Sequence, residues 1–397
     1  MGVGISVGWS VAVSGCGPES AVAYHYDTDA GQDSPRTPGQ KRKQVIMPHT
    51  QPSVHSRNPG VALVLLAALT AASTAHAQTP PTLDIYWIDV EGGAATLVVT
   101  PDRESVLMDA GWPRPDFRDT ERIEAAMRDA GITEIDYLLI SHFHRDHVGG
   151  VPQLADRVPI GQVIDHGDSV EQADEAALAL WQDYETVAEG RRRTVVPGDK
   201  LPLSRIEFSF IAAHRRLADA PERRAPNRRC AEATAPSIDE SENGHSLGYL
   251  LSLGGFQFLN LGDLTPDREY ALACPENRLG IVDLWQVPHH GGYGAIRPEL
   301  AGALEPTVAV VNNGPRKGGT PGSLESAQGT AGVGDVWQSH RALADGAAHN
   351  TDERMTANLT EEENCKGHWI KATVQPDGRN WTMTNGRTGY SRNYQSK

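Results

Sequence analysis

Short runs of apolar residues, separated by glycine and proline, fill the chain from about residue 80 to residue 312. Such runs, rich in β-branched side chains, are typical of buried strands. Other windows carry apolar residues three and four positions apart, which predicts helices. Because strands and helices recur in two halves, the pattern predicts an α/β protein with layered sheets rather than a doubly wound parallel sheet. The expected strands are 83–89, 95–100, 105–109, 134–141, 163–165, 206–213, 247–253, 256–261, 282–287 and 307–312, and the expected helices are 120–130 and 173–188.

Two later regions depart from this rhythm. Residues 214–244 lack a clear period and carry many charges, which predicts a long surface insertion within a catalytic domain of residues 80–320. Residues 321–397 are expected to form a C-terminal extension that packs on the same domain, with strands near 369–374 and 381–384.

The insertion has a local excess of arginine although the whole chain is acidic. The 397 residues carry a formal net charge of −15, which argues against a protein that coats nucleic acid through its global charge. Arginine forks match phosphate oxygens, so the insertion is a candidate phosphate site. The alternative is a solvated loop whose arginines pair with the acids of residues 239–242. The arginines are Arg215, Arg216, Arg223, Arg224, Arg228 and Arg229.

An export signal is predicted near the N-terminus. Residues 61–72 form an apolar run that is too short to cross a bilayer as a helix. Arg57 precedes this run and an Ala-His-Ala motif follows it, which is typical of a signal peptide cut before Gln78. The signal peptide is expected to cover residues 47–77. Export places the mature chain in the periplasm or outside a bacterial cell, without a membrane span after cleavage.

Residues 1–46 are predicted to lie outside the fold. They are rich in Gly, Ser, Asp and Pro and show little periodicity, so Met47 is the expected start of the protein. The alternatives are a disordered N-terminal tail for this stretch and a buried helix for residues 61–72. After cleavage the chain keeps three of its four cysteines, which permits one disulfide without saying which pair forms it.

The strongest chemical signal directly follows the predicted strand 134–141. Three histidines and one aspartate fall within six residues there. Imidazole nitrogens with a carboxylate suit zinc or another first-row divalent ion. A surface histidine cluster is the alternative, which the position after a buried strand disfavours. The four residues are His142, His144, Asp146 and His147.

This HxHxDH motif resembles that of the metallo-β-lactamase superfamily, and other segments match that family in the expected order. Residues 105–111 (SVLMDAG) resemble the strand that precedes the family's metal motif. The Gly-Asp pair that ends at Asp263 resembles the one whose aspartate bridges both metals, and His245 lies 18 residues before it. A Pro-His-His-Gly-Gly turn after the strand 282–287 resembles the terminal histidine motif. The resemblance covers about residues 82–312 and implies a four-layer αββα sandwich.

Within the superfamily, three segments resemble the hydrolase domain of ComEC-like DNA-uptake proteins, namely 88–94 (IDVEGGA), 243–247 (NGHSL) and 287–292 (VPHHGG). Two positions depart from that branch. Ala94 stands where the branch usually carries an aspartate, and His245 stands where it often carries an asparagine. The gained histidine implies a fuller binuclear site. The tail resembles that of secreted stand-alone members of the branch.

Carried over to this sequence, the family pattern implies two divalent cations. Zinc is the first choice, and manganese or iron also suits histidine and aspartate ligands. The resemblance assigns three histidines to the first cation. It assigns two residues of the motif and one histidine of the Pro-His-His-Gly turn to the second cation. One aspartate is a ligand of both. The first set is His142, His144 and His245, the second contains Asp146 and His147, and the bridge is Asp263.

The last histidine motif leaves a choice between two neighbours. His290 is favoured as the ligand because the family's last histidine commonly precedes a small residue, and His289 would then face the substrate. Asp146 or Asp263 is expected to orient a metal-activated hydroxide and to take its proton. Asp109 is expected either to hold a ligand histidine by its second ring nitrogen or to be a turn residue at a strand end.

These features predict an exported binuclear hydrolase in which two cations activate a bridging water. A phosphodiester is the first choice of substrate, because the branch is nuclease-like and the insertion is rich in arginine. Lactone, thioester or β-lactam hydrolysis is the alternative, followed by a non-catalytic metal-binding module. The expected partner is a small-molecule or phosphodiester substrate, with nucleic acid only as a substrate. His166 is expected to be a hydrogen-bonded histidine of the core or rim rather than part of the cleft.

Overall fold

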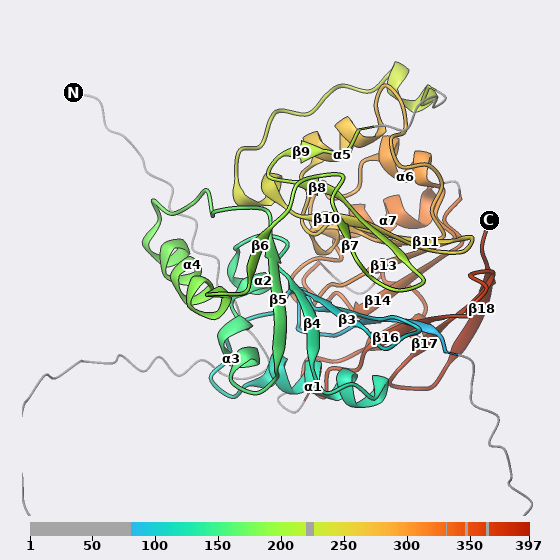
Figure 1. Cartoon of the computed structure of the whole chain (residues 1–397). Helices are drawn as coiled ribbons and strands as arrows, with labels where there is room; N and C mark the ends of the chain where they lie inside the picture. Colours follow the sequence, from blue (N-terminus) through green and yellow to red (C-terminus); the bar gives the residue numbers. More distant parts are fainter. Residues whose placement is uncertain (1–80, 220–225, 331, 346–347, 363–364) are drawn as a thin grey trace, which may run out of the picture. The chain divides into compact units, whose positions relative to one another are not determined.

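Two β-sheets pack face to face in the part of the chain that the computed structural model describes (Figure 1). That part comprises residues 81–219, 226–330, 332–345, 348–362 and 365–397. The predicted signal peptide and the stretch that precedes it lie outside these ranges. None of the helices within them has the length and apolar character needed to cross a bilayer.

The first sheet combines the early strands of the chain with its last three. Its order is β18 (Ser391–Gln395), β17 (Asn380–Asn385), β16 (Ile370–Val374), β1 (Leu83–Trp87), β2 (Thr96–Val99), β3 (Ser105–Met108), β4 (Ile135–Leu139), β5 (Ile160–Asp165) and β6 (Arg192–Thr194). Neighbours from β18 to β3 are antiparallel, whereas β3, β4, β5 and β6 pair in parallel.

The second sheet is built from the middle of the chain. Its order is β15 (Thr356–Asn358), β14 (Asp335–His340), β13 (Val308–Val311), β12 (Leu284–Gln286), β11 (Phe256–Asn260), β10 (Gly248–Leu253), β8 (Glu207–Ala213) and β7 (Lys200–Leu201), with β9 (Arg216–Leu217) paired to β8. The strands from β11 to β15 pair in parallel, and the others pair antiparallel.

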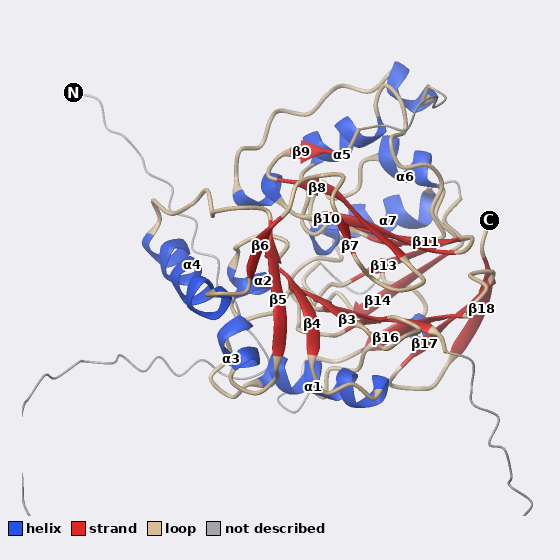
Figure 2. Ribbon diagram, viewed as in Figure 1, coloured by secondary structure: helices blue, strands red, loops and turns tan. Residues whose placement is uncertain are grey.

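Helices cover the outer face of each sheet, which gives four layers in the order αββα (Figure 2). Between the sheets lies a shared core, in which Trp87 of the first sheet meets Phe258 of the second edge to face. The predicted αββα sandwich is therefore confirmed. The outer helices are α1 (Arg118–Ala130) and α4 (Glu175–Ala188) on the first sheet, and α5 (Pro266–Ala273), α6 (Pro298–Leu304) and α7 (Pro321–Gly329) on the second. Shorter helical segments are α2 (Arg145–Val148), α3 (Val151–Ala155), η1 (Arg228–Ala231), η2 (Glu242–His245), η3 (Pro288–Gly291) and η4 (Glu353–Met355).

Local sequence explains the ends of two of these helices. The helix α4 begins after Asp174, whose side chain accepts a hydrogen bond from the backbone N–H of Ala177. A side-chain acceptor at this position satisfies one of the free N–H groups of the first turn. The helix α1 ends at Gly131, whose φ of 70° lies in the left-handed region that glycine adopts most easily. Both helices lie close to their predicted ranges because these signals are local.

The predicted C-terminal extension adds strands to both sheets. The strands β14 and β15 extend the second sheet, and β16, β17 and β18 extend the first. The strands expected near 369–374 and 381–384 correspond to β16 and β17. The sequence did not reveal β14, because its half-polar residues (DVWQSH) obscure the strand period.

A disulfide ties the insertion of residues 214–244 to the body of the domain. Cys230 of the insertion is bonded to Cys274, which directly follows α5. Cys365 is free in the described part of the chain. Residues 220–225 of the insertion lie outside the described residues.

Candidate metal centre

The predicted metal-binding segments come together where strands of both sheets end. The HxHxDH motif follows β4 and continues into α2, which carries Asp146 and His147. From the second sheet, Asp263 comes shortly after β11, and His290 lies in η3, directly after β12. Both sheets therefore deliver polar side chains to one place.

Four buried side chains from these segments bring their donor atoms together. The Nε2 atoms of His147 and His290 lie 3.1 Å apart. Each of them lies 3.2 Å from Oδ2 of Asp146 and 3.2 Å from Oδ2 of Asp263. Four donors around a tetrahedral zinc ion at about 2.0–2.1 Å lie about 3.3 Å from one another. We call these four residues the carboxylate–histidine cluster, and their type and spacing fit a divalent cation.

The charges of this cluster stabilise one another. Burial alone would raise the pKa of Asp146, but the Lys317 ammonium and the His147 ring hold it well below its usual value. Burial would lower the pKa of His147, but the carboxylates of Asp263 and Asp146 raise it well above its usual value. Without a cation, the cluster therefore keeps these carboxylates ionised and His147 protonated.

Asp109 orients the His147 ring of the cluster through the second ring nitrogen of that histidine. Its Oδ2 lies 2.8 Å from Nδ1 of His147 and accepts a hydrogen bond of 2.6 Å from the hydroxyl of Ser141. Its backbone φ is 66°, and this left-handed conformation costs an L residue roughly 1 kcal/mol. A carboxylate that holds one ring nitrogen fixes the direction of the other. Of the two roles expected for Asp109, the structure shows the contact with a histidine of the motif.

The Pro-His-His-Gly turn separates its two histidines. His290 is buried, with its Nδ1 3.3 Å from the backbone oxygen of Asn312 and its Nε2 in the cluster. The side chain of His289 is 38% exposed, and its Nε2 lies 3.9 Å from Oδ2 of Asp263. Both histidines have a positive φ, of 50° for His289 and 54° for His290, and this backbone turns the second ring inward. The structure thus places His290 inside the cluster and His289 at its exposed edge.

His142 and His144 lie beside the cluster without joining it. The His142 ring is buried with its centroid 4.0 Å from that of His147, and its Nδ1 lies 3.0 Å from Oγ of Ser141. Its Nε2 has no hydrogen-bond partner among the described residues. Burial and the neighbouring His147 lower the pKa of His142 well below its usual value, so the ring is neutral. A buried ring nitrogen without a partner is rare and suits a cation ligand. His144 lies nearer the surface, with its Nε2 3.2 Å from Oε2 of Glu171.

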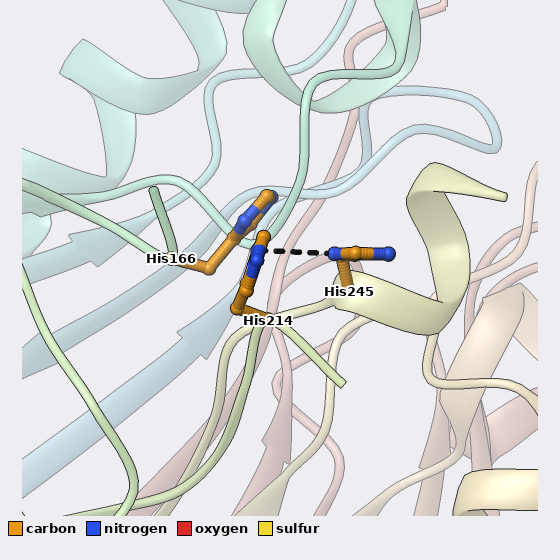
Figure 3. Close-up of side chains that lie close together, drawn as sticks. All are labelled: His166, His214 and His245. Carbon is orange, nitrogen blue, oxygen red and sulfur yellow. Dashed lines mark hydrogen bonds between the residues drawn. The ribbon is translucent and has the colours of Figure 1, made fainter. Parts of the chain in front are cut away.

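The ring of His245 contacts two other histidines of the site region, His214 and His166. The Nδ1 of His245 lies 3.1 Å from Nδ1 of His214. Donor atoms of His245, His214 and His166 all lie within 4.8 Å of one another (Figure 3). Burial, with His166 and His214 close by, lowers the pKa of His245 to about 4. The assignment of His245 to the first cation stays a prediction. The segment that carries His245 lies beside the HxHxDH motif, because the backbone N–H of Leu247 donates to the oxygen of Ser141 at 2.7 Å.

Glu242 explains where His245 lies, and sequence reasoning missed it. Its carboxylate accepts hydrogen bonds from the backbone N–H of Val170 at 2.8 Å and of Phe143 at 3.2 Å. It also lies 2.8 Å from Nε2 of His166, which is a buried hydrogen-bonded histidine as expected. These contacts hold η2, and with it His245, beside the end of β5. Glu242 is one of several acids in the insertion, and no motif distinguishes it.

Lys317 is a second site residue that sequence reasoning missed. It follows β13, its ammonium contacts the carboxylate of Asp146, and it lies 5.3 Å from the ring centre of Trp112. Gly318 follows it with a φ of 74°, and a Cβ there would lie 2.2 Å from the backbone oxygen of His290. Only glycine permits this close approach. The available signal was a cation beside two glycines after a predicted strand.

Among the described arginines of the insertion, Arg215 forms ion pairs with acids of the protein. Arg215 lies 3.5 Å from Glu240 and 3.4 Å from Asp267. Arg216 forms no ion pair with any described residue. None of them contacts the carboxylate–histidine cluster within the described ranges. The contact of Arg215 with Glu240 agrees with the interpretation of the insertion as a surface loop.

Comparisons with known proteins bear on this geometry. The sequence pattern of the Metallo-beta-lactamase superfamily matches residues 88–216. Recombination protein 2 of Haemophilus influenzae is 23% identical over 236 residues, which cover 59% of this chain and 24% of the relative. ComE operon protein 3 of Bacillus subtilis is 24% identical over 245 residues, which cover 58% of this chain and 28% of the relative. The chain thus spans about a quarter of the length of these two relatives. A UPF0173 metal-dependent hydrolase of Cupriavidus taiwanensis is 24% identical over 273 residues, which cover 64% of this chain and 82% of the relative.

The family match, the fold and the donor cluster are consistent with the same family. The matched residues contain the HxHxDH motif, and the described residues form the expected αββα sandwich. The donor cluster lies where that motif meets the second sheet. The chain therefore contains a domain of the metallo-β-lactamase superfamily over residues 88–216 and is a metal-dependent hydrolase that resembles the ComEC-like branch.

Proposed function

We propose that this hydrolase is exported and uses two divalent cations to cleave phosphodiesters. One observation carries the proposal: two carboxylates and two imidazoles converge at cation-ligand spacing, and a lysine contacts one of the carboxylates. Bound divalent cations supply a Lewis acid and a source of hydroxide near neutral pH. The roles of the protein's own residues follow from their contacts.

The two cations would lie side by side. The carboxylate–histidine cluster would hold one of them. His142 and His144 would hold the other, since His142 directs a buried nitrogen without a protein partner next to the cluster. The family pattern makes Asp263 the shared ligand. The family pattern adds His245 as the third ligand of the cation that His142 and His144 would hold.

Asp263 is placed to handle the proton of the attacking water. Its Oδ2 lies 3.2 Å from Nε2 of both His147 and His290, and the side chain is buried. Burial would raise the pKa of Asp263, but the rings of His147 and His290 hold it well below its usual value, so the carboxylate is ionised. An ionised carboxylate at this position orients a water molecule by accepting its hydrogen bond.

Lys317 and His289 are placed to bind the substrate. The Lys317 ammonium neutralises Asp146 in the metal-free protein. Once a cation takes over that role, the ammonium is available to a non-bridging phosphate oxygen, since charge-assisted pairs of this kind are strong. His289 lies at the exposed edge, 3.9 Å from Asp263, where it can donate a hydrogen bond to the leaving oxygen. Positive charge at the site therefore comes from Lys317 and the cations rather than from the arginines of the insertion.

The charge of the chain favours small or single-stranded diesters. A formal net charge of −15 opposes the approach of long duplex DNA, whose binding needs a positive surface. The similarity to Recombination protein 2 favours nucleotide diesters among the possible substrates. Export is supported by the disulfide between Cys230 and Cys274, because disulfides persist mainly in oxidising compartments.

The test is turnover of a chromogenic phosphodiester by the full chain loaded with zinc or manganese. We expect hydrolysis that Asp263→Asn abolishes. The control Asp183→Asn changes an exposed aspartate of α4 and should retain activity. A chain that binds cations but hydrolyses only thioester, lactone or β-lactam substrates would overturn the phosphodiester assignment. A chain that binds cations and hydrolyses none of these would favour a metal-binding module.

A further inference from the structure

Three side chains that the proposed mechanism does not use meet where the C-terminal extension contacts the end of the first strand. Asp89 comes two residues after β1, His340 is the last residue of β14, and Cys365 lies in the segment before β16. A carboxylate oxygen, an imidazole nitrogen and the sulfur lie within 4.8 Å of one another. The three residues are far apart in sequence, so the fold rather than local structure brings these atoms together.

Two of these side chains carry a buried polar atom without a hydrogen-bond partner among the described residues. The atoms are Oδ2 of Asp89 and Nε2 of His340, and both residues are 0% exposed. Most buried polar atoms in proteins have a partner, because an unpaired one loses the hydrogen bonds that water would provide. Two such atoms beside the half-buried Cys365 therefore call for a group that all three side chains can bind.

The other ring nitrogen of His340 is already in use. Nδ1 lies 2.9 Å from the backbone oxygen of Arg341, to which it donates a hydrogen bond. In the neutral ring this leaves the lone pair on Nε2, which is a recurring feature of metal-bound histidines. Burial would lower the pKa of His340, but Cys365 and the carboxylate of Asp89 raise it above its usual value. The surroundings of Nε2 therefore favour a positive charge, which a metal ion provides.

Arg122 holds the backbone on two sides of this group. Its guanidinium donates to the backbone oxygens of Asp89 and Cys365, at 2.8 Å in each case. It pairs with Glu91 at 2.9 Å, whereas Oδ2 of Asp89 lies 3.9 Å away, beyond the length of a hydrogen bond. A Cβ at Gly367, whose φ is 61°, would lie 2.1 Å from Nε of Arg122, so glycine permits this approach. Arg122 thus positions the segments without occupying the unpaired oxygen.

The three donors suit zinc or a similar first-row divalent ion. Thiolate and imidazole ligands favour such ions over calcium and magnesium, and carboxylate oxygens also bind zinc. A thiolate together with a carboxylate cancels a divalent charge. A small shift of the half-buried Cys365 side chain brings all three donors within reach of one ion, and water would be the fourth ligand.

We infer that Asp89, His340 and Cys365 form a separate binding site for zinc or another first-row divalent ion, which we call the Asp-His-Cys site. It shares no residue with the carboxylate–histidine cluster and does not rest on the proposed function. The ion would tie the C-terminal extension to the turn after β1. That turn continues to Gly92, where a Cβ would lie 2.7 Å from Cβ of Lys317. The site would therefore stabilise the backbone beside a residue that contacts the cluster.

The test uses cobalt(II), because its bond to a thiolate gives a charge-transfer absorption in the near ultraviolet. The full-length chain is freed of metal with a chelator and loaded with cobalt without oxygen. Cys230 and Cys274 form a disulfide, so of the four cysteines only Cys365 and Cys16 can supply a thiolate. We expect the unaltered chain to show the absorption and Cys365→Ala to lose it. The matched change Cys16→Ala, at a cysteine outside the described residues, should retain it.

Zinc ions counted per chain by elemental mass spectrometry give a second readout. We expect Asp89→Asn and Cys365→Ala each to bind one ion fewer than the unaltered chain. The control His349→Ala removes a histidine that pairs with Glu325 elsewhere and should bind the full number. Circular dichroism in chelator checks that each variant folds, and the cobalt spectrum of the unaltered chain needs no variant.

Two outcomes would overturn the inference. In the first, the cobalt-loaded unaltered chain shows no thiolate absorption, which would leave a proton on His340 in place of a metal ion. In the second, the absorption survives in Cys365→Ala. Asp263→Asn should keep the absorption, because Asp263 belongs to the other cluster. A chain that lacks the absorption and still hydrolyses the phosphodiester would remove the Asp-His-Cys site and leave the proposed function standing.

Discussion

The carboxylate–histidine cluster and the group formed by His166, His214 and His245 hold imidazole rings in opposite electrostatic settings. In the first, two buried carboxylates surround the rings and raise the pKa of His147. In the second, no carboxylate lies among the converging donors, and His245 has its pKa lowered to about 4. The comparison teaches that the neighbouring carboxylates, rather than the number of histidines, decide whether the pKa of a buried ring is raised or lowered.

The largest effect is expected from Asp263→Asn. Loss of this carboxylate removes a cluster ligand and the acceptor for the proton of water. Changes to residues that merely support ligands cost 10–100-fold, so we expect turnover of the phosphodiester to fall by more than about 100-fold. An Asp263→Asn protein with full turnover would contradict the role of the cluster.

Asp109→Asn should selectively weaken the carboxylate–histidine cluster. The amide holds Nδ1 of His147 less well than the carboxylate at 2.8 Å does. We expect zinc affinity of that cluster to fall by about 10–100-fold, as for other supporting carboxylates. Competition with a chelator of known affinity measures this. The matched change Asp102→Asn alters an exposed aspartate and should leave the zinc affinity unchanged. If both changes lower the zinc affinity equally, Asp109 does not support the cluster through His147.

Lys317→Gln should mainly affect substrate binding. Loss of the ammonium next to Asp146 removes a charge-assisted contact of about 1.5 kcal/mol with an anionic substrate, or roughly tenfold in KM. The exposed Lys366→Gln serves as the control for loss of one positive charge. Steady-state kinetics with a charged phosphodiester and a neutral ester separate the two effects. If KM rises equally for both substrates, Lys317 does not recognise charge.

The smallest effect is a difference in pH dependence between the two places in metal-free protein. The raised pKa of His147 contributes stability below pH about 6.5 that is lost as the pH rises through that raised value. His245 is the reverse case, because its pKa of about 4 lies below the usual value of 6.5. Between these values the unfolded chain binds a proton that the folded chain does not, so stability falls as the pH drops.

The free energy of unfolding, measured with a chemical denaturant in the presence of a chelator at several pH values in this range, gives the pH dependence due to each residue. We expect His245→Gln to flatten the pH dependence between about 4 and about 6.5 and to leave the behaviour above it unchanged. His147→Gln should affect the upper range instead. If His245→Gln leaves the lower slope as it was, the electrostatic contrast between the two places is wrong.

The sequence predicted those features that depend on local signals. Consecutive residues such as Asp146 and His147 keep their relation in any strand-to-helix turn, so their closeness was predictable. The same holds for α4, which begins at the capping residue Asp174. The choice of His290 over His289 was less secure, since it depends on a left-handed turn that the sequence only suggests through the following glycines.

The features that the sequence did not predict depend on contacts between distant segments. The spacing between His245 and Asp263 suggested a family ligand, and that assignment stays a prediction. The carboxylate of Glu242, which holds the same segment, accepts hydrogen bonds from the backbone N–H groups of Phe143 and Val170, and no motif announces these contacts. Lys317 lies 171 residues from Asp146, and no motif connects them. His214 has no signal beyond its position after a strand.

Anomalous diffraction from crystals of the zinc-loaded chain tests the central claim most directly. The account predicts one zinc peak among Asp146, His147, Asp263 and His290, and a second peak beside His142 and His144. A single peak, with none beside His142 and His144, would contradict the two-cation centre. The absence of any peak among Asp146, His147, Asp263 and His290 would contradict the proposed hydrolytic centre itself.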